Sequence, residues 1–420
     1  MKQLKKSEKQ DLLIQLIDIS PYLDKEVKKL NSGRTLISYQ AKGNLEDYIN
    51  SAKVHSIINK LFRNENSINT NISFNKFMID LNELLPNLKK EDGVSIVKKY
   101  NGLLRYHKTL IKRKFDYLFA IYGTKLRRSS ISFGDFTLFN IEGSGCDLVN
   151  EYPTISGHFH EIKSHFRSAV LVKISVEAVD EFFAIQKAET YIRTFEYVLY
   201  FYLSIGHQKI NGGIYDGIVN REVPILQIHN DKVYDRNQSI NLSSIVKIDE
   251  LVLVIESSKK NRLWKLITKP SEQRTEMEER LMIAIHWYGK AISDIDVMQS
   301  YLMYFFAIES LLSFHKDKII DRLTINLCKI CKFHEKKKQG NFHVIGDDIS
   351  GKRIKDLYDI RSRLTHGPRS GKKYILPVYK DLSDIEYIAH SIIDVFSFHH
   401  ELSLVKTTKE LDEWLDRSET

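Results

Sequence analysis

Apolar residues recur every three or four positions through the first part of the chain, which is the spacing of one face of an α-helix. Two such stripes are Leu12, Leu13, Leu16 and Ile17, then Ile57, Ile58, Leu61 and Phe62. Pro21 and Pro86 interrupt the pattern, since proline breaks a helix interior. The pattern predicts a mostly helical N-terminal region over residues 1–125.

The pattern changes after residue 126. Residues 130–133 and 136–139 show the short alternation typical of strands around a turn at Gly134 and Asp135, and 170–176 are rich in β-branched residues. Residues 179–203 are apolar nearly all round, which predicts a buried helix, and 223–267 return to short strands, at 223–228 and 251–256. Residues 126–268 are therefore predicted to be an α+β middle region, a candidate sensor.

A helical pattern follows Pro270, which disfavours continuation of the preceding segment, and Ser271 is able to cap what comes next. The pattern predicts about five helices over residues 271–404. Ser383 and Glu386 have the spacing of a capping box for the last long one. Residues 405–420 read as a charged tail. The expected fold class is α+β multidomain, with a helical N-terminal region, a central region containing strands and a C-terminal all-α bundle.

Composition narrows the class of protein. The 420 residues are 42% hydrophobic, enough for several cores, and 63 basic residues stand against 54 acidic ones for a net charge of +9. This balance is compatible with a local basic surface for nucleic acid. The longest apolar run is too short to span a membrane, and the first residues lack a secretion core, so we expect a cytoplasmic protein without membrane contact. Three cysteines make a disulfide framework improbable.

The candidate chemistry lies at the end of one predicted helix, where Arg361 precedes His366 by five residues. Gly367 and Pro368 end that helix, so His366 is expected in its last turn, where the helix dipole favours an imidazolium. Two residues five positions apart point about 140° away from each other on an ideal helix. They converge only if the last turn of the helix is distorted or a second copy of the chain contributes, so the spacing suggests a composite site, expected to be dimeric.

The residues around this pair resemble the Apea-like branch of the HEPN superfamily (higher eukaryotes and prokaryotes nucleotide-binding). Tyr358, Arg361, His366 and Gly367 match its signature, residues 305–312 resemble its earlier helix with an acidic residue, Glu309, and residues 321–323 resemble its third helix. The resemblance covers roughly 271–404. One departure is Ser362, where many active members carry Asn, Asp or His. The resemblance implies a HEPN ribonuclease of antiviral defence or toxin type, a homodimer that cuts RNA without metal and leaves a 2',3'-cyclic phosphate and a 5'-hydroxyl.

The residue types suit that reaction. His366 would transfer protons between the ribose 2'-hydroxyl and the leaving oxygen, and Arg361 would hold the phosphate. Glu309 needs a buried partner, for which Arg361 is the first candidate. Tyr358, Ser362 and Thr365 are supporting candidates, with packing expected for Tyr358. Seven further basic residues form the expected RNA-binding rim: Lys352, Arg353, Lys355, Arg363, Arg369, Lys372 and Lys373. In the competing structural interpretation, Arg361 pairs with Asp359 or Glu309 and His366 merely ends a helix.

Two alternatives belong to other classes of protein. Asp147 with Glu161 and Lys163 has the residue types of a magnesium nuclease in the middle region. A bundle that binds RNA or protein without catalysis is the other. Cys328, Cys331 and His334 have zinc-like spacing, but buried helical thiols explain it better. The main hypothesis needs no cofactor or metal. Its expected partners are RNA (tRNA, rRNA or mRNA), a second copy of the chain and a phage-derived trigger bound by the N-terminal region.

Overall fold

The computed structural model describes most of the chain: residues 4–19, 24–29, 35–40, 45–65, 72–88, 91–121, 126–142, 147–158, 170–204, 219–229, 232–242, 262–294, 296–313, 319–337, 351–366, 377 and 379–417. The chain divides into two compact units. The first comprises Met1–Tyr117, Ser175–Glu189 and Leu226–Asp235, and the second comprises Leu118–Ile174, Thr190–Ile225 and Arg236–Thr420.

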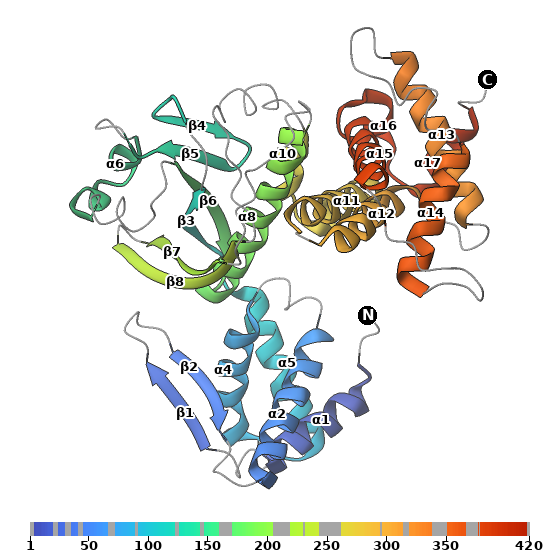
Figure 1. Cartoon of the computed structure of the whole chain (residues 1–420). Helices are drawn as coiled ribbons and strands as arrows, with labels where there is room; N and C mark the ends of the chain where they lie inside the picture. Colours follow the sequence, from blue (N-terminus) through green and yellow to red (C-terminus); the bar gives the residue numbers. More distant parts are fainter. Residues whose placement is uncertain are drawn as a thin grey trace. The chain divides into compact units, whose positions relative to one another are not determined.

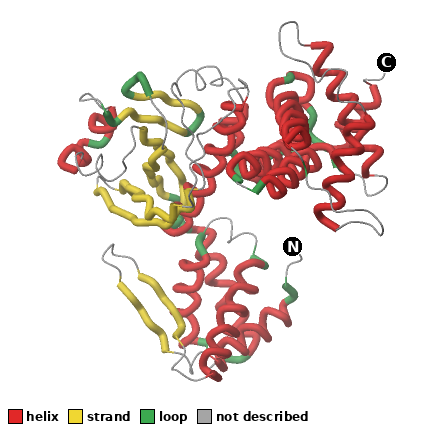
Figure 2. The backbone as a smooth tube through the Cα atoms, in the orientation of Figure 1, coloured by secondary structure: helices red, strands yellow, loops and turns green. Residues whose placement is uncertain are grey.

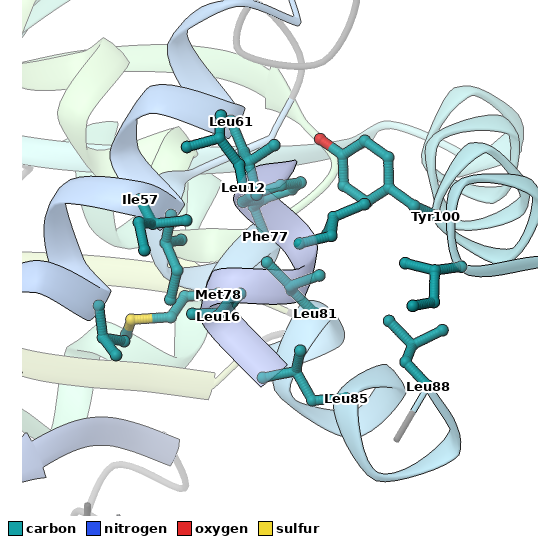
Figure 3. Close-up of a cluster of buried hydrophobic side chains, with 14 of the residues drawn as sticks. Leu12, Leu16, Ile57, Leu61, Phe77, Met78, Leu81, Leu85, Leu88 and Tyr100 are labelled. Carbon is teal, nitrogen blue, oxygen red and sulfur yellow. The ribbon is translucent and has the colours of Figure 1, made fainter. Parts of the chain in front are cut away.

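The N-terminal region is mainly helical, as predicted. Its elements are α1 (Lys6–Ile19), β1 (Asp24–Lys29), β2 (Thr35–Gln40), α2 (Leu45–Arg63), α4 (Phe74–Leu84), the 3-10 turn η2 (Leu85–Asn87) and α5 (Gly93–Thr109). Strands β1 and β2 form an antiparallel hairpin that the helical spacing did not predict. Figure 3 shows how Leu12 and Leu16 of α1, Ile57 and Leu61 of α2 and Phe77 and Leu81 of α4 share one core.

A buried polar cluster lies beside this core. His107 of α5 is buried, and its Nε2 lies 2.7 Å from one carboxylate oxygen of Asp80 on α4. Lys76 donates to the other oxygen at 2.8 Å. Burial would raise the pKa of Asp80, but the hydrogen bonds from His107 and Lys76 outweigh it, so the pKa is lowered. The carboxylate is therefore fully engaged in fixing α4 against α5.

The middle region contains a six-stranded sheet, in the order β4-β5-β6-β3-β7-β8. The strands are β3 (Arg113–Ile121), β4 (Ser130–Phe133), β5 (Phe136–Asn140), β6 (Val170–Ala178), β7 (Val219–His229) and β8 (Lys232–Leu242). Strand β3 begins at Arg113, within residues that we predicted to be helical. Strands at 130–133, 136–139 and 170–176 were predicted, and so was the strand at 223–228. The strand predicted at 251–256 lies outside the described residues.

Gly134 forms the turn between β4 and β5, with φ of 55°, a left-handed conformation that glycine adopts without strain. Helix α8 (Glu181–Ser204) follows β6, as predicted, and Phe195 packs on Phe136 of β5 at 4.8 Å between ring centroids. Two short elements, α6 (Asp147–Glu151) and the 3-10 helix η3 (Pro153–His158), follow β5 in the chain and precede β6. Helix α10 (Arg262–Thr268) replaces the end of the predicted strand-rich segment.

Helix α10 connects the sheet to the C-terminal helices within the second unit. The backbone carbonyl of Trp264 lies against Gly134, and the Trp264 ring contacts Phe195 of α8. From the other side of α10, Arg262 donates to the carbonyls of Phe396 at 2.6 Å and Ser403 at 2.8 Å. These carbonyls end helices, so the guanidinium satisfies acceptors that a helix leaves open.

The remaining elements are helical (Figures 1 and 2). They are the 3-10 turn η4 (Ser271–Gln273), α11 (Glu276–Ser293), α12 (Val297–Leu312), α13 (Ile319–Lys337), α14 (Gly351–His366), α15 (Tyr379–Phe398), α16 (His400–Leu404) and α17 (Thr408–Arg417). Gly289 of α11 allows close contact with α8, because a Cβ there would lie 2.3 Å from the ring of Tyr197. The predicted charged tail contains α17, whose Leu411 and Leu415 are buried.

Two predicted caps were wrong. Thr275, not Ser271, caps α11, in a capping box with Glu278. Ser383 lies inside α15, which begins at Tyr379. The predicted fold class is confirmed: a helical N-terminal region, a middle region with strands and an all-α C-terminal bundle. Within the described segments, none of the helices combines the length and the apolar character that a membrane span requires.

Candidate active site on helix α14

Helix α14 positions both residues of the candidate pair. Its buried positions Ile354, Leu357 and Ile360 recur at helical spacing, and the helix packs against α12 and α13. Tyr301 of α12 donates to the Leu357 carbonyl at 2.7 Å in the buried interior. This bond fixes α14 on α12, and Arg361, one turn after Leu357, lies on the same side of α14, where it also contacts α12.

Arg361 pairs with Glu309 of α12, as the sequence predicted. One guanidinium nitrogen, Nη2, lies 3.0 Å from Oε2, and the two side chains are 16% and 18% exposed. The guanidinium also lies over two rings, 5.5 Å from the centroid of Tyr358 and 5.9 Å from that of Phe306. Tyr358 in turn meets the ring of Phe305 edge to face at 6.0 Å. Carboxylate and rings together hold the guanidinium plane in one orientation.

Charge at this position is costly, and the pair only partly offsets the cost. Burial raises the pKa of Glu309, while the positive charge and hydrogen bond of Arg361 act in the lowering direction without cancelling it. Nε of Arg361 is buried and has no hydrogen-bond partner among the described residues. Arg361 therefore keeps donor capacity beyond the one bond to Glu309.

His366 is the last residue of α14, and its side chain is exposed. Gly367 and Pro368, which we predicted to end the helix, lie outside the described residues. Thr365 donates to the Arg361 carbonyl at 3.0 Å, which commits its hydroxyl hydrogen to the backbone. Ser362 is half-buried on the same turn. The structure therefore brings Glu309, Tyr358 and Arg361 together and leaves His366 at the helix end.

The predicted RNA-binding rim divides into paired and unpaired cations. Arg353 bonds Asp381 at 2.7 Å and Asp384 at 2.6 Å, both on α15. This contact fixes α14 on α15 and removes Arg353 from the available phosphate-binding residues. Arg363 pairs with Asp359 one turn earlier in α14, so Asp359 is not the partner of Arg361.

Two lysines of α14 remain accessible. Lys355 pairs with Asp321 at 3.1 Å, but both side chains are more than half exposed, so the pair is weak. Lys352 is exposed. The predicted residues Arg369, Lys372 and Lys373 lie outside the described residues.

The rival metal sites gain no support from the described segments. Asp147 accepts hydrogen bonds from the hydroxyls of Ser129 at 2.7 Å and Ser130 at 2.5 Å, and these bonds lower its pKa. Glu161 and Lys163 lie outside the described residues, as do the side chains of Cys331 and His334. Cys328 is half-buried and is not part of a disulfide. Among the residues with described positions, no group of His, Cys, Asp or Glu is arranged to hold a metal ion.

The aromatic residues beside Arg361 were not predicted as a unit. Trp287 of α11 meets Phe306 of α12 at 5.1 Å between centroids, and the Lys290 ammonium lies 5.3 Å from the indole centroid. A tryptophan followed by a lysine three residues later was the available signal. The site thus combines an oriented guanidinium, an exposed imidazole and neighbouring rings. No protein-family model, curated protein or solved structure matches this chain.

Proposed function

We propose that the C-terminal bundle is a HEPN-type endoribonuclease that cuts RNA through its own 2'-hydroxyl, with Arg361 and His366 as the reacting side chains. The observation that carries the proposal is the state of Arg361. Its guanidinium is oriented by Glu309, Phe306 and Tyr358, its side chain is 16% exposed, and its one hydrogen bond within the described residues, to Glu309, uses Nη2. An exposed His366 ends the same helix. The resemblance in sequence to the HEPN superfamily supports the same assignment.

The reaction needs a proton acceptor, a cation beside the phosphate and a proton donor. His366 as a neutral imidazole removes the proton from the ribose 2'-hydroxyl, and the 2'-oxygen attacks the adjacent phosphorus. Arg361 holds the nonbridging oxygens, where negative charge accumulates. The bond from phosphorus to the 5'-oxygen breaks, and that oxygen takes a proton from an imidazolium. The products are a 2',3'-cyclic phosphate and a 5'-hydroxyl, and no metal is needed.

Helix geometry favours a site built from two copies. Arg361 and His366 are separated by about 140° around the axis of α14. One copy then supplies the guanidinium next to the imidazole of the other. In this proposal the protein is a homodimer of antiviral defence or toxin character, and its N-terminal and middle regions respond to a phage-derived trigger.

The test is incubation of the full-length protein with total bacterial RNA in EDTA, followed by mapping of fragment ends. The wild type is expected to give cyclic-phosphate ends, and Arg361→Ala and His366→Ala are expected to give none. Arg280→Ala is the matched control, because it also removes an arginine of the bundle that pairs with a glutamate, Glu276. Cleavage that persists in His366→Ala would refute the mechanism, and cleavage that disappears in EDTA would point to a metal nuclease.

A non-catalytic RNA-binding bundle is the second candidate. The Arg361–Glu309 pair favours it, because a paired guanidinium also has a purely structural role. In that case His366→Ala binds RNA like the wild type, and neither protein cleaves it under any activating condition.

A further inference from the structure

We infer that Trp287 and Phe306 form a stacking site for unpaired nucleotides of RNA, next to the Arg361 phosphate position. The inference rests on the proposed function, since it names the class of RNA that this site takes: single-stranded rather than duplex. Trp287 lies on α11 and Phe306 on α12, which pack as an antiparallel pair of helices.

The geometry leaves ring surface available. Trp287 and Phe306 meet edge to face, with an angle of 63° between their planes and 5.1 Å between their centroids. In such a pair the ring that supplies the edge keeps its own faces clear of the partner. Both side chains are half-buried, so they are anchored in the bundle and still reach its surface. An anchored ring loses little side-chain entropy when a base stacks on it.

Cations surround the rings. The Lys290 ammonium lies over the indole of Trp287, and the Arg361 guanidinium lies over Phe306. His286, adjacent to Trp287 and in edge contact with it, has its pKa lowered by burial and by the charges of Lys290 and Arg193. Arg193 is exposed on α8. Rings interleaved with cations match a nucleic-acid strand, in which bases alternate with phosphates.

The positive charges of Lys290 and Arg361 beside the two rings also argue against an apolar protein partner. Ile283, one turn before Trp287 on α11, is 41% exposed and extends the apolar surface. A protein interface would use Ile283 together with Trp287, whereas base stacking needs only the planar rings. Ile283 therefore offers a matched control on the same face of the same helix.

The experiment is a fluorescence titration with a single-stranded oligonucleotide whose riboses are 2'-O-methylated, so that the 2'-hydroxyl reaction is blocked. We expect Trp287→Ala to weaken binding about tenfold, which is the scale of one base stacked on an aromatic side chain. Trp287→Phe should stay within about threefold of the wild type, since a planar ring remains. Ile283→Ala should not change the affinity, and none of the variants should change binding to the corresponding duplex.

Lys290→Gln provides a second variant, whose folding is not at risk from a lost ring. It should reduce the slope of log affinity against log salt by about 0.7, the value for one phosphate contact on a single strand. If Trp287→Ala does not fold, two other measurements test the stacking site. The first is the salt slope of Lys290→Gln, and the second is the quenching of tryptophan fluorescence by the oligonucleotide, which should be lost in Trp287→Phe. Unchanged slope and unchanged quenching would overturn the stacking site.

The two proposals fail in different ways. Equal affinity of wild type and Trp287→Ala for the single strand, with cleavage of natural RNA intact, overturns the stacking site alone. Binding through Trp287 without cleavage of natural RNA overturns the nuclease alone. A change of molecular mass in solution for both Trp287→Ala and Ile283→Ala, at unchanged RNA affinity, would assign this face to a second copy of the chain and overturn the stacking site.

Discussion

Removing one partner of the Arg361–Glu309 pair is expected to lower the free energy of unfolding by more than the intact pair adds to it, because the remaining charge is left without a partner. A fully buried charge left without its partner costs about 3–5 kcal/mol. These side chains keep 16% and 18% of their exposure, so solvent screening reduces the cost. We expect Arg361→Ala and Glu309→Ala each to lower the free energy of unfolding by about 2 kcal/mol, and the double variant to lose about 1–2 kcal/mol less than their sum.

The loss of free energy of unfolding in Arg361→Ala, its stability deficit, should depend on pH. Burial raises the pKa of Glu309, and Arg361 opposes that increase, so the pKa rises further when the guanidinium is removed. A carboxyl group whose pKa is higher in the folded state favours folding most at low pH, below its unfolded pKa, and this contribution is lost as the pH rises through the folded pKa. The deficit of Arg361→Ala should therefore be larger at pH 8 than at pH 5.

Urea unfolding followed by tryptophan fluorescence measures these quantities. All three tryptophans, Trp264, Trp287 and Trp414, lie in the second unit, on α10, α11 and α17. A coupling energy below about 0.5 kcal/mol, within the usual error of additivity, or equal deficits at pH 5 and pH 8, would refute the reasoning. If the double variant regains stability but still does not cut RNA, the lost activity belongs to phosphate binding and not to folding.

Three further changes test the packing of the fold. Gly289→Ala should lower the free energy of unfolding by about 1–3 kcal/mol in urea titrations followed by far-UV circular dichroism, because the new Cβ would lie 2.3 Å from the Tyr197 ring. Gly102→Ala, with open space around it, should be neutral or stabilising. Burial raises the pKa of Glu196 to about 7, so Glu196→Gln should increase the melting temperature at pH 8 and leave it unchanged at pH 5. Thr275→Ala should cost about 1 kcal/mol in the same titrations by removing the cap of α11.

The elements that the sequence predicted are those whose signals are local. The turn at Gly134 and the alternation on either side of it identify β4 and β5. The hairpin of β1 and β2 escaped prediction because the first strand, Asp24–Lys29, is mostly charged and shows no apolar alternation. Helix α10 has only seven residues, and a short apolar run does not distinguish a helix from a strand by its period.

The two wrong caps have different reasons. Ser271 and Thr275 are both able to cap a helix, but only Thr275 has a glutamate three residues later, at Glu278, which the capping box requires. Ser383 has that glutamate too, yet α15 begins earlier, because Arg353 binds carboxylates at positions 381 and 384 and so stabilises the first turns of that helix. A contact across 28 or 31 residues overrides a local motif there.

The difference between local signals and long-range contacts also explains which part of the site was predictable. Glu309 lies in an apolar run, so its need for a cation was visible, and Arg361 satisfies it. Asp381 and Asp384 lie in an ordinary polar pattern, and nothing in the sequence marked them as the partners of Arg353. The contact of Trp287 with Phe306 depends on the register between α11 and α12, which the separate apolar stripes do not determine.

Ion pairing, more than net charge, therefore decides where a polyanion would bind. Arg353, Arg361 and Arg363 are the three arginines described on α14, and all three have carboxylate partners. If RNA binds this bundle, its first attraction must come from cations with less engaged side chains, such as Lys352 on α14 and Lys290 beside Trp287. Arg361 would then act only after the strand has arrived, because a phosphate has to share its guanidinium with Glu309. Variants of the lysines should accordingly change the rate of association, whereas variants of Arg361 should change the reaction that follows.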